Sequence, residues 1–255
     1  MSSLTLPLSR LAGKTILITG AARRIGQTIA RCLHGDGANL VIHARRSIVE
    51  AQQLVDTLNS VRAGSAICLS GELCEPSACA QLVAEAIGHF GRLDGLVNNA
   101  SSFFPTPIGS IDMAAWNDLV GSNFMAPLFL SQAAAPALRE SRGAIVNITD
   151  VHAERPLKNY PLYCAAKGAL LTLTRALAVE LGPEVRVNAV APGPILWPDN
   201  DAFDQDARQD IVAHTLLKRE GSPDDIASAV QFFLSNAAYV TGQVMNVDGG
   251  RTAHL

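Results

Sequence analysis

The sequence predicts one α/β domain with a doubly wound, mostly parallel seven-stranded sheet and helices on both faces. Short apolar runs of strand length alternate with longer amphipathic segments, which is the rhythm of βαβ units. The runs are continuously apolar, as in strands buried on both faces. The 255 residues, 48% of them hydrophobic, are enough to bury one full core, so a single domain spanning 1–255 is expected.

The elements follow in a regular order along the chain. A strand-like run at 14–19 precedes a helical segment at 24–36, and a second run at 39–44 precedes a helical segment at 47–61. Five more apolar runs supply the remaining strands, at 65–70, 93–99, 143–149, 185–191 and 244–247. Helical periodicity occupies most of the intervals, including 161–181. In such a sheet, ligands bind in a crevice at the carboxyl ends of the strands.

The stretch 192–210 is the least regular part of the chain. It combines prolines with acidic residues and has no sustained hydrophobic period, which predicts a mobile flap and no second domain. We expect this loop to contact the substrate.

Charge and cysteine content exclude some classes of partner. Lysine and arginine number 20 against 23 acidic residues, a net charge of −3, so bulk electrostatics indicate neither a nucleic-acid nor a membrane partner. The first ten residues lack the pattern of a signal peptide, and no uncharged apolar stretch approaches 18 residues. The five cysteines form an odd set without metal-ligand spacing. We therefore expect a cytoplasmic protein with reduced thiols and no metal site.

A turn rich in small residues follows the first strand. Gly20 and Gly26 flank the sequence AARRI and open the first helix, so backbone amides there can approach a pyrophosphate, which the helix N-terminus also attracts. The alternative is that Gly20 only permits a tight turn and Gly26 a close helix–sheet contact.

The end of the second strand favours NADP as the dinucleotide. NAD-selective folds place an acidic residue here for the ribose hydroxyls, but this chain has His43, Arg45, Arg46 and Ser47 and no acid. Arginine donors suit a phosphate dianion. The alternative is that both arginines are solvated surface charges.

Tyr163 and Lys167 stand four residues apart in a helical segment, so both project from one face. An ammonium about 4 Å from the phenol favours the phenolate by roughly 4 kcal/mol, on the order of three pKa units. This predicts a pair that can exchange a proton. Because Tyr160 lies near the same face, the spacing alone does not decide which tyrosine takes part.

Four motifs together resemble the short-chain dehydrogenase/reductase family over nearly the whole chain. They are TGAARRIG at 19–26, NNA at 98–100, YCAAK at 163–167 and the pair Pro192 and Gly193, and the DGG at 248–250 resembles the family's closing turn. The resemblance implies an oxidoreductase in which Asn99 borders the adenosine, Asn123 helps to hold the proton-relay region and Lys167 binds the nicotinamide ribose.

Two departures from that pattern resemble the pteridine reductases of the family. Arg24 stands where most members have a third glycine, and Asp150, thirteen residues before Tyr163, stands where most have a serine. The runs 43–47 and 99–106 resemble the same group. By this resemblance Arg24 touches cofactor phosphate and pterin, Ser101 contacts the substrate region and Phe103 stacks on the pterin.

The chemistry of a pterin agrees with these residues. A flat aromatic ring is held well between a phenyl ring, here Phe103, and a nicotinamide. Reducing a C=N bond also needs a proton on nitrogen, which Asp150 and Tyr163 can pass while Lys167 balances the charge. The alternatives are that Phe103 belongs to the core or a lid, that Asp150 is a cap with Thr149 replacing the serine, and that Ser101 caps a turn.

The sequence thus predicts an NADPH-dependent pteridine reductase that acts on a dihydropterin and assembles as a homotetramer through helix 161–181 and strand 244–247. The expected catalytic residues are Asp150, Tyr163 and Lys167. The expected substrate contacts are Arg24, Ser101, Phe103, Asp150 and Tyr163. The expected cofactor contacts are Gly20, Arg24, Ile25, Gly26, His43, Arg45, Arg46, Ser47, Asn99, Ala100, Ser101, Tyr163, Lys167, Pro192 and Gly193.

Three alternatives to this function stay open. A dihydromonapterin or dihydrofolate reductase shares the pterin ring and differs in its side chain. A general carbonyl reductase would use Tyr163 to protonate an alkoxide. A cofactor-binding regulatory protein without turnover is the third, although both Tyr163 and Lys167 are present.

Overall fold

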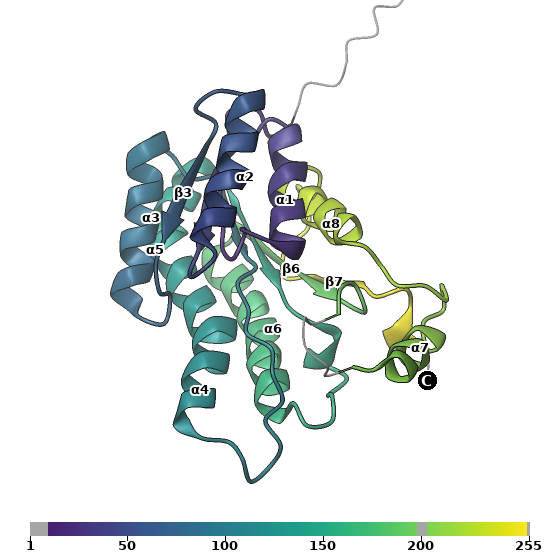
Figure 1. Ribbon diagram of the computed structural model, residues 1–255. Helices are drawn as coiled ribbons and strands as arrows, with labels where there is room; N and C mark the ends of the chain where they lie inside the picture. The colour runs from purple at the N-terminus through teal and green to yellow at the C-terminus, as the bar shows by residue number, and fades with distance from the viewer. Residues whose placement is uncertain (1–9, 198–202, 254–255) are drawn as a thin grey trace, which may run out of the picture.

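A computed structural model describes residues 10–197 and 203–253 (Figure 1). Within them, one sheet has the strand order β3-β2-β1-β4-β5-β6-β7, and every neighbouring pair is parallel. The strands are β1 (Thr15–Ile18), β2 (Asn39–Ala44), β3 (Ala66–Ser70), β4 (Gly95–Asn98), β5 (Ala144–Ile148), β6 (Arg186–Pro192) and β7 (Val244–Val247). The predicted fold is confirmed, and each predicted strand coincides with an observed one.

Helices cover both faces of the sheet. Helices α1 (Arg24–Gly35), α2 (Ile48–Val61) and α8 (Pro223–Ser235) pack on one face, and α3 (Pro76–Phe90), α5 (Ala126–Ser141) and α6 (Pro161–Leu181) pack on the other. Side chains alternate between the two cores along each strand: Ile16 and Ile18 of β1 join the first, whereas Leu17 joins the second. This alternation explains why the strands are apolar at every position.

The order in which strands are added to the sheet reverses at the neighbouring strands β1 and β4. Strands β2 and β3 lie to one side of β1, and β4 to β7 lie to the other. The helices that follow β1 and β4 therefore leave on opposite faces, which opens a crevice at the carboxyl ends of these two strands. Thr19 bridges the crevice floor, where its hydroxyl accepts hydrogen bonds from the Asn99 and Ala100 amides at 3.0 Å.

A π-helical turn interrupts the segment between β4 and β5. Helix α4 (Met113–Val120), capped by the Asp112 carboxylate, runs into the turn η1 (Gly121–Met125) before α5 begins. Such turns are rare and frequently occur at functional sites. The turn η1 places Asn123, which is completely buried, beside the crevice.

The stretch 192–210 contains more regular structure than the sequence predicted. Helix α7 (Gln205–Ala213) begins inside it, and the Asp204 side chain caps it by accepting from the Ala207 amide. None of the α7 residues is buried, so the helix lacks the apolar stripe by which sequence periodicity is recognised. Positions 198–202 of this stretch lie outside the described residues.

Helix α6 is apolar and long enough to cross a membrane by length and composition alone. Half of its most apolar window is buried inside the domain, where it packs against β6 and α5. A core helix meets the same criterion, and the buried Lys167 of α6 faces the interior of this fold.

Candidate active site

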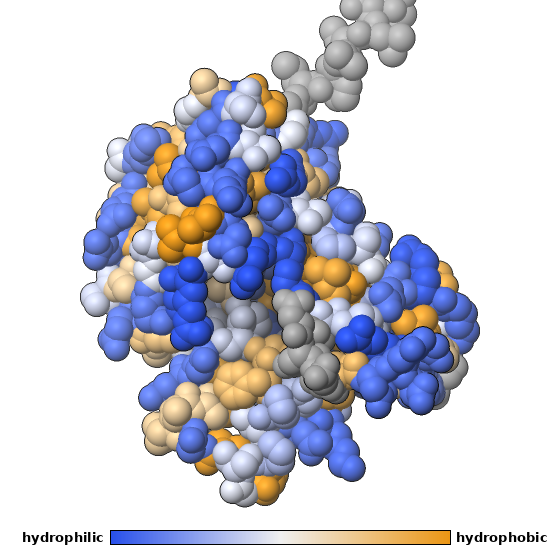
Figure 2. Space-filling view, viewed as in Figure 1, coloured by the Kyte–Doolittle hydropathy of each residue, from blue (hydrophilic) through white to orange (hydrophobic). Residues whose placement is uncertain are grey.

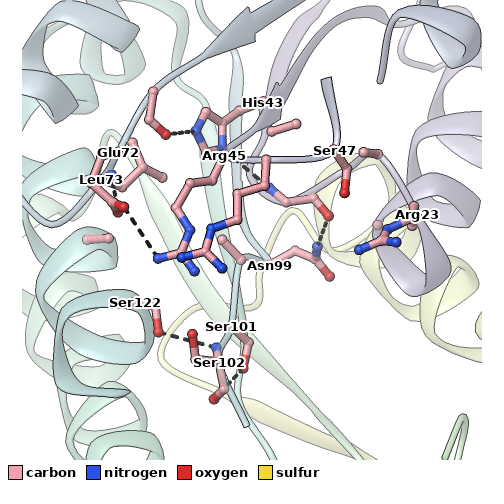
Figure 3. Close-up of a pocket in the computed structure, with 18 of the residues that line it drawn as sticks. Arg23, His43, Arg45, Ser47, Glu72, Leu73, Asn99, Ser101, Ser102 and Ser122 are labelled. Carbon is pink, nitrogen blue, oxygen red and sulfur yellow. Dashed lines mark hydrogen bonds and ion pairs between the residues drawn. The ribbon is translucent and has the colours of Figure 1, made fainter. Parts of the chain in front are cut away.

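Two adjoining cavities lie at the carboxyl ends of the strands. The first, about 490 Å³, runs from the turn after β1 across the end of β2 (Figure 3). The second, about 360 Å³, lies between the loop after β4, the start of α6 and the segment after β6. Arg24, Ile25 and Ser101 line both, so the two cavities are parts of one cleft.

The structure brings most of the predicted cofactor residues into the first cavity. Its wall includes Gly20, Arg24, Ile25, Gly26, His43, Arg45, Arg46, Ser47, Asn99, Ala100 and Ser101. Tyr163 and Gly193 line the second cavity instead. Pro192 and Lys167 are buried behind the cleft.

The glycines of the turn leave no room for side chains. Gly20 has a φ of +61°, and a Cβ there would lie 2.8 Å from the Ala100 Cα. At Gly26 a Cβ would lie 2.6 Å from both the Asn99 Nδ2 and the Gly20 carbonyl oxygen. The turn therefore needs glycine at both positions, and it presents the bare backbone at the start of α1 that a pyrophosphate requires.

Arg24 adopts a left-handed conformation, with a φ of +56°. This backbone favours glycine, as in the third glycine of the usual motif, and costs an arginine about 1–2 kcal/mol. Its guanidinium spans the cleft: Nη2 donates to the carbonyls of Trp197 at 2.8 Å and Leu196 at 3.3 Å. Arg24 thus links the cofactor turn to the segment after β6.

His43 contacts the turn through its ring. The Gly20 amide donates to Nδ1 at 3.4 Å, and Nε2 lies 3.0 Å from the Gly71 carbonyl oxygen, which assigns the proton to Nε2. Burial lowers the pKa of this imidazole. The ring is therefore a neutral part of the cavity wall, and its nitrogens hold backbone groups.

The side chains of Arg45, Arg46 and Ser47, at the end of β2, line the first cavity. They are not equally available to bind a phosphate. Arg45 lies 3.4 Å from the Glu72 carboxylate (Figure 3). It also lies 3.8 Å from the carboxylate of Asp118. Arg46 is exposed in the same wall, and Ser47 stands at the start of α2. Because two carboxylates already share Arg45, Arg46 is the better donor for a phosphate.

Asp150 and Tyr163 meet in the wall of the second cavity, and Lys167 is buried behind them. The Tyr163 hydroxyl donates to Asp150 Oδ2 at 2.7 Å, while Oδ1 accepts the His152 amide at 2.8 Å. Asp150 therefore contacts Tyr163 and also caps the short helix η2 (Val151–Ala153). Lys167 Nζ donates to the Ile148 carbonyl at 2.9 Å and lies 5.8 Å from the centre of the Tyr163 ring.

The predicted shift of Tyr163 towards the phenolate is wrong for this structure. Burial of the ring, and then the adjacent Asp150 carboxylate, raise the pKa of Tyr163 well above its ordinary value of 10.0. Burial also lowers the pKa of Lys167 to about 8, although Asp150 acts in the opposite direction. Burial and the carboxylate, both absent from the two-residue argument, act in the same direction, so Tyr163 keeps its proton and is suited to donate it.

Ser101 is held by the π-helical turn. Its hydroxyl donates to Asn123 Oδ1 at 2.7 Å, and Asn123 Nδ2 donates to the carbonyls of Ser102 and Leu119, both at 2.9 Å. Ser101 also lowers the pKa of Tyr163 against the larger effects of burial and Asp150. The serine is thus more than a turn cap, because it lies beside the Tyr163 hydroxyl.

Phe103 forms part of an aromatic cluster in the wall of the second cavity. Its ring stacks on Tyr160 at 4.5 Å with a 15° interplanar angle, and it meets the Tyr163 ring edge-on at 4.8 Å. Tyr160 therefore supports Phe103 on one face. Thr149, the alternative to the missing serine, is buried and donates to the Val190 carbonyl at 3.1 Å, which turns it away from the cleft.

The second cavity contains residues that the sequence analysis did not single out. Val151, His152, Ile211 and Arg251 lie outside the loop predicted to contact the substrate, whereas Pro194, Ile195, Leu196, Trp197 and Phe203 lie in that loop but were not named individually. The unusual tryptophan and phenylalanine within 192–210 were the only available signal, because loop residues have no periodicity to show which way they point.

Comparisons with known proteins agree with this geometry. A family profile described as enoyl-(acyl carrier protein) reductase matches residues 20–252. Pteridine reductase 1 of Leishmania tarentolae is 37% identical, covering 92% of this chain and 94% of its own length. The granaticin polyketide synthase putative ketoacyl reductase 2 of Streptomyces violaceoruber is 36% identical, covering 94% and 95%.

The chain belongs to the short-chain dehydrogenase/reductase family.

Solved structures of this family superpose closely on the chain. A putative short-chain alcohol dehydrogenase from Sinorhizobium meliloti has a TM-score of 0.92 at 32% identity, with 98% of this chain and all of that one covered. A blue fluorescent protein from a metagenomic library, solved in complex with NADPH, has a TM-score of 0.89 at 35% identity, with 95% and 99% covered.

As a short-chain dehydrogenase/reductase, this chain is an oxidoreductase with NADP(H) as its cofactor. Its own residues fit that dinucleotide. The exposed backbone at Gly20 and Gly26, where a side chain has no room, suits the pyrophosphate, and the arginines at the end of β2 suit the additional phosphate.

Proposed function

We propose that this short-chain reductase is an NADPH-dependent pteridine reductase, which adds a hydride to a C=N bond of a dihydropterin to give a tetrahydropterin. The observation that carries the proposal is the 2.7 Å hydrogen bond from Tyr163 to Asp150 in a cavity wall that also contains Phe103. A carboxylate in place of the family's usual serine fits a substrate rich in nitrogen donors. The named activity of the Leishmania tarentolae relative supports this choice.

The residues of the chain supply the proton and the orientation. Bound NADPH supplies the hydride, which is added to carbon. Tyr163, whose raised pKa keeps its proton in place, donates that proton to the ring nitrogen, and Asp150 orients the hydroxyl and the substrate's N–H groups. Lys167, positively charged below pH 8, stabilises the negative charge that develops on Tyr163 as the proton leaves.

The remaining roles follow from the walls of the two cavities. Arg46 and Ser47 bind the additional phosphate of NADPH, and Asn99 borders the adenosine. Phe103, supported from behind by Tyr160, stacks on the pterin, while Ser101 and Arg24 contact it at the junction of the cavities. The segment 192–210 serves as the substrate loop of a single domain.

The proposal includes an assembly and a compartment. The reductase works as a homotetramer in the cytoplasm, with apolar residues of α6 and β7 packed between subunits. The net charge of −3 does not favour a nucleic-acid partner.

Two other functions use the same groups. A dihydromonapterin or dihydrofolate reductase would need only a different fit around the pterin side chain. A carbonyl reductase is favoured by relatives named ketoacyl reductase and, at 34% identity in Bos taurus, L-xylulose reductase. Tyr163 as a proton donor suits a ketone as well, so the choice depends on Asp150 and Phe103.

A substrate panel tests the proposal directly. Biopterin, dihydrobiopterin, dihydromonapterin, dihydrofolate and simple ketones are each assayed with NADPH and with NADH. The proposal expects the highest kcat/KM for a dihydropterin with NADPH. Much faster reduction of ketones than of any pterin would establish the carbonyl-reductase alternative, and binding of NADPH without turnover of any compound would indicate a regulatory protein.

A further inference from the structure

Trp197 occupies the loop side of the substrate cavity. It lies in the segment after β6 and shares the cavity wall with Phe103 and Phe203. Figure 2 shows apolar surface, in orange, on the lower part of this face of the molecule, where Figure 1 draws α4. Nothing in the catalytic arrangement of Asp150, Tyr163 and Lys167 accounts for a large indole at this place.

The indole is fixed by three side chains. Its Nε1 donates to Glu220 Oε1 at 2.8 Å, the Arg208 guanidinium lies 5.4 Å from the ring, and the Phe203 ring packs against it at 5.5 Å with a 48° tilt. Indole nitrogen can only donate, and Glu220 satisfies it. The remaining surface of the ring is apolar and available for contact within the cavity.

The main chain beside the indole is fixed as well. Arg24, at the start of α1, donates to the Trp197 and Leu196 carbonyls, so the position of the indole is tied to the cofactor turn. A side chain held in advance loses little rotamer freedom when a ligand arrives. Trp197 therefore has the properties of a preorganised contact surface.

We propose that Trp197 determines substrate specificity: its indole provides an aromatic surface on the loop side of the cavity that favours flat, conjugated substrates over aliphatic ones. Glu220 is the positioning residue that holds the indole there. This inference rests on the proposed function, because it extends the recognition of the pterin from Phe103 to a second aromatic residue. It concerns selection among substrates and not the transfer of the hydride or proton.

The test replaces Trp197 with leucine and with phenylalanine. In Trp197→Leu, kcat/KM for the dihydropterin falls by about tenfold or more, as expected for one lost aromatic stacking contact, and the change lies mainly in KM. For an aliphatic ketone kcat/KM stays within about twofold, so the selectivity ratio collapses. Trp197→Phe restores most of the preference for the dihydropterin. Equal losses for both substrates would overturn the proposal, because they would indicate a general disturbance of the site.

The chain offers a matched control for the tryptophan. Trp116, the only other tryptophan of the sequence, lies on α4, is 48% exposed and is absent from the wall of either cavity. Trp116→Leu leaves the selectivity ratio at the wild-type value. The affinity for NADPH, measured by its fluorescence, stays unchanged in both leucine variants, because Arg24 binds the loop through backbone carbonyls.

Glu220 gives a second, independent measurement. Glu220→Gln keeps an oxygen that can accept the indole N–H and retains the selectivity ratio, whereas Glu220→Ala releases the indole and lowers the ratio by several-fold with kcat unchanged. If Glu220→Ala leaves the KM values at those of the wild type, Glu220 does not position the indole.

The role of Trp197 can be tested even if the proposed pteridine-reductase function fails. If the wild-type protein reduces no pterin but reduces ketones, the pteridine-reductase proposal fails. The selectivity test is then made between an aryl and an alkyl ketone of equal reactivity. Loss of the aryl preference in Trp197→Leu supports the role of Trp197 even then, and an unchanged preference refutes it.

Discussion

The Tyr163 hydroxyl donates a 2.7 Å hydrogen bond to the Asp150 carboxylate, although the two residues come from different elements and lie thirteen positions apart. The contact raises the pKa of Tyr163 and orients its proton. It replaces the hydroxyl-to-hydroxyl contact that a serine at position 150 would provide.

The first prediction concerns Asp150→Ser. We expect kcat for the dihydropterin to fall by about 10²–10⁴, the usual contribution of a positioned proton-transfer group, while the affinity for NADPH stays within twofold. Steady-state kinetics and a cofactor titration measure the two effects. Because Asp150 also caps η2, Asp112→Ser at the cap of α4 is the control for a lost carboxylate cap. An Asp150→Ser variant as fast as the wild type would favour the carbonyl-reductase alternative.

The second prediction concerns Phe103→Ala. Loss of one stacked ring costs on the order of 1–3 kcal/mol of binding, so KM for the pterin rises by about tenfold or more. Phe103 also meets the edge of Tyr163, and kcat therefore falls to a smaller extent. Phe103→Leu keeps apolar contact with Tyr160 and separates packing from stacking: if it binds the pterin as well as the wild type, the ring does not stack on the substrate.

The third prediction concerns the choice between NADPH and NADH. Arg46→Ala should lower the ratio of kcat/KM for NADPH over NADH by about 10–100-fold, since a charge-assisted hydrogen bond contributes about 1.5–3 kcal/mol. Arg45→Ala should have a smaller effect because Glu72 and Asp118 already neutralise part of its charge. Arg139→Ala, at an exposed position on α5, serves as the control. An unchanged ratio in Arg46→Ala would refute the assignment.

The fourth prediction concerns pH. Lys167 has a pKa of about 8 in the folded free enzyme, so kcat/KM for NADPH should fall as the pH rises through 8 and the ammonium is lost. In Lys167→Arg the fall near pH 8 should disappear, because a guanidinium stays charged. A wild-type profile that is flat from pH 7 to 9.5 contradicts the prediction.

The lowered pKa of Lys167 also makes the stability of the fold depend on pH. The unfolded chain retains the Lys167 proton up to about the ordinary value of 10.5, whereas the folded chain releases it near 8. Between these values the unfolded state binds more protons, so this group's contribution to stability becomes more favourable as the pH rises. Below pH 8 its unfavourable contribution is fully present. Denaturation at pH 7 and pH 9, compared between the wild type and Lys167→Met, measures this difference.

The fifth prediction concerns the homotetramer. Val179 on α6 is 85% exposed in the single chain, and β7 is one of the two edge strands of the described sheet, so both offer surfaces for packing between subunits. Light scattering should give four times the monomer mass at micromolar concentration, and Val179→Glu should shift the protein to smaller species. A wild-type protein that remains a monomer would rule out this assembly.

The sequence by itself determined the fold and the cofactor turn of this protein. Its strands are continuously apolar because both of their faces are buried, so the local pattern reveals the parallel sheet. Gly20, Gly26 and the arginines after β2 were recognisable because a phosphate cradle depends on consecutive residues at one strand end. Tyr163 and Lys167 were recognisable because helical spacing alone places them on one face.

Only the tertiary structure decided the electrostatics and the walls of the substrate cavity. Tyr163 was expected to lose its proton readily, but its pKa depends on burial and on Asp150, which sheet and helix packing bring to it. The same holds for Trp197, whose place depends on contacts with Arg24, Arg208 and Glu220. Periodicity reports which face of an element is apolar, whereas a pKa or a loop position depends on groups that are distant in the sequence and become neighbours only after folding.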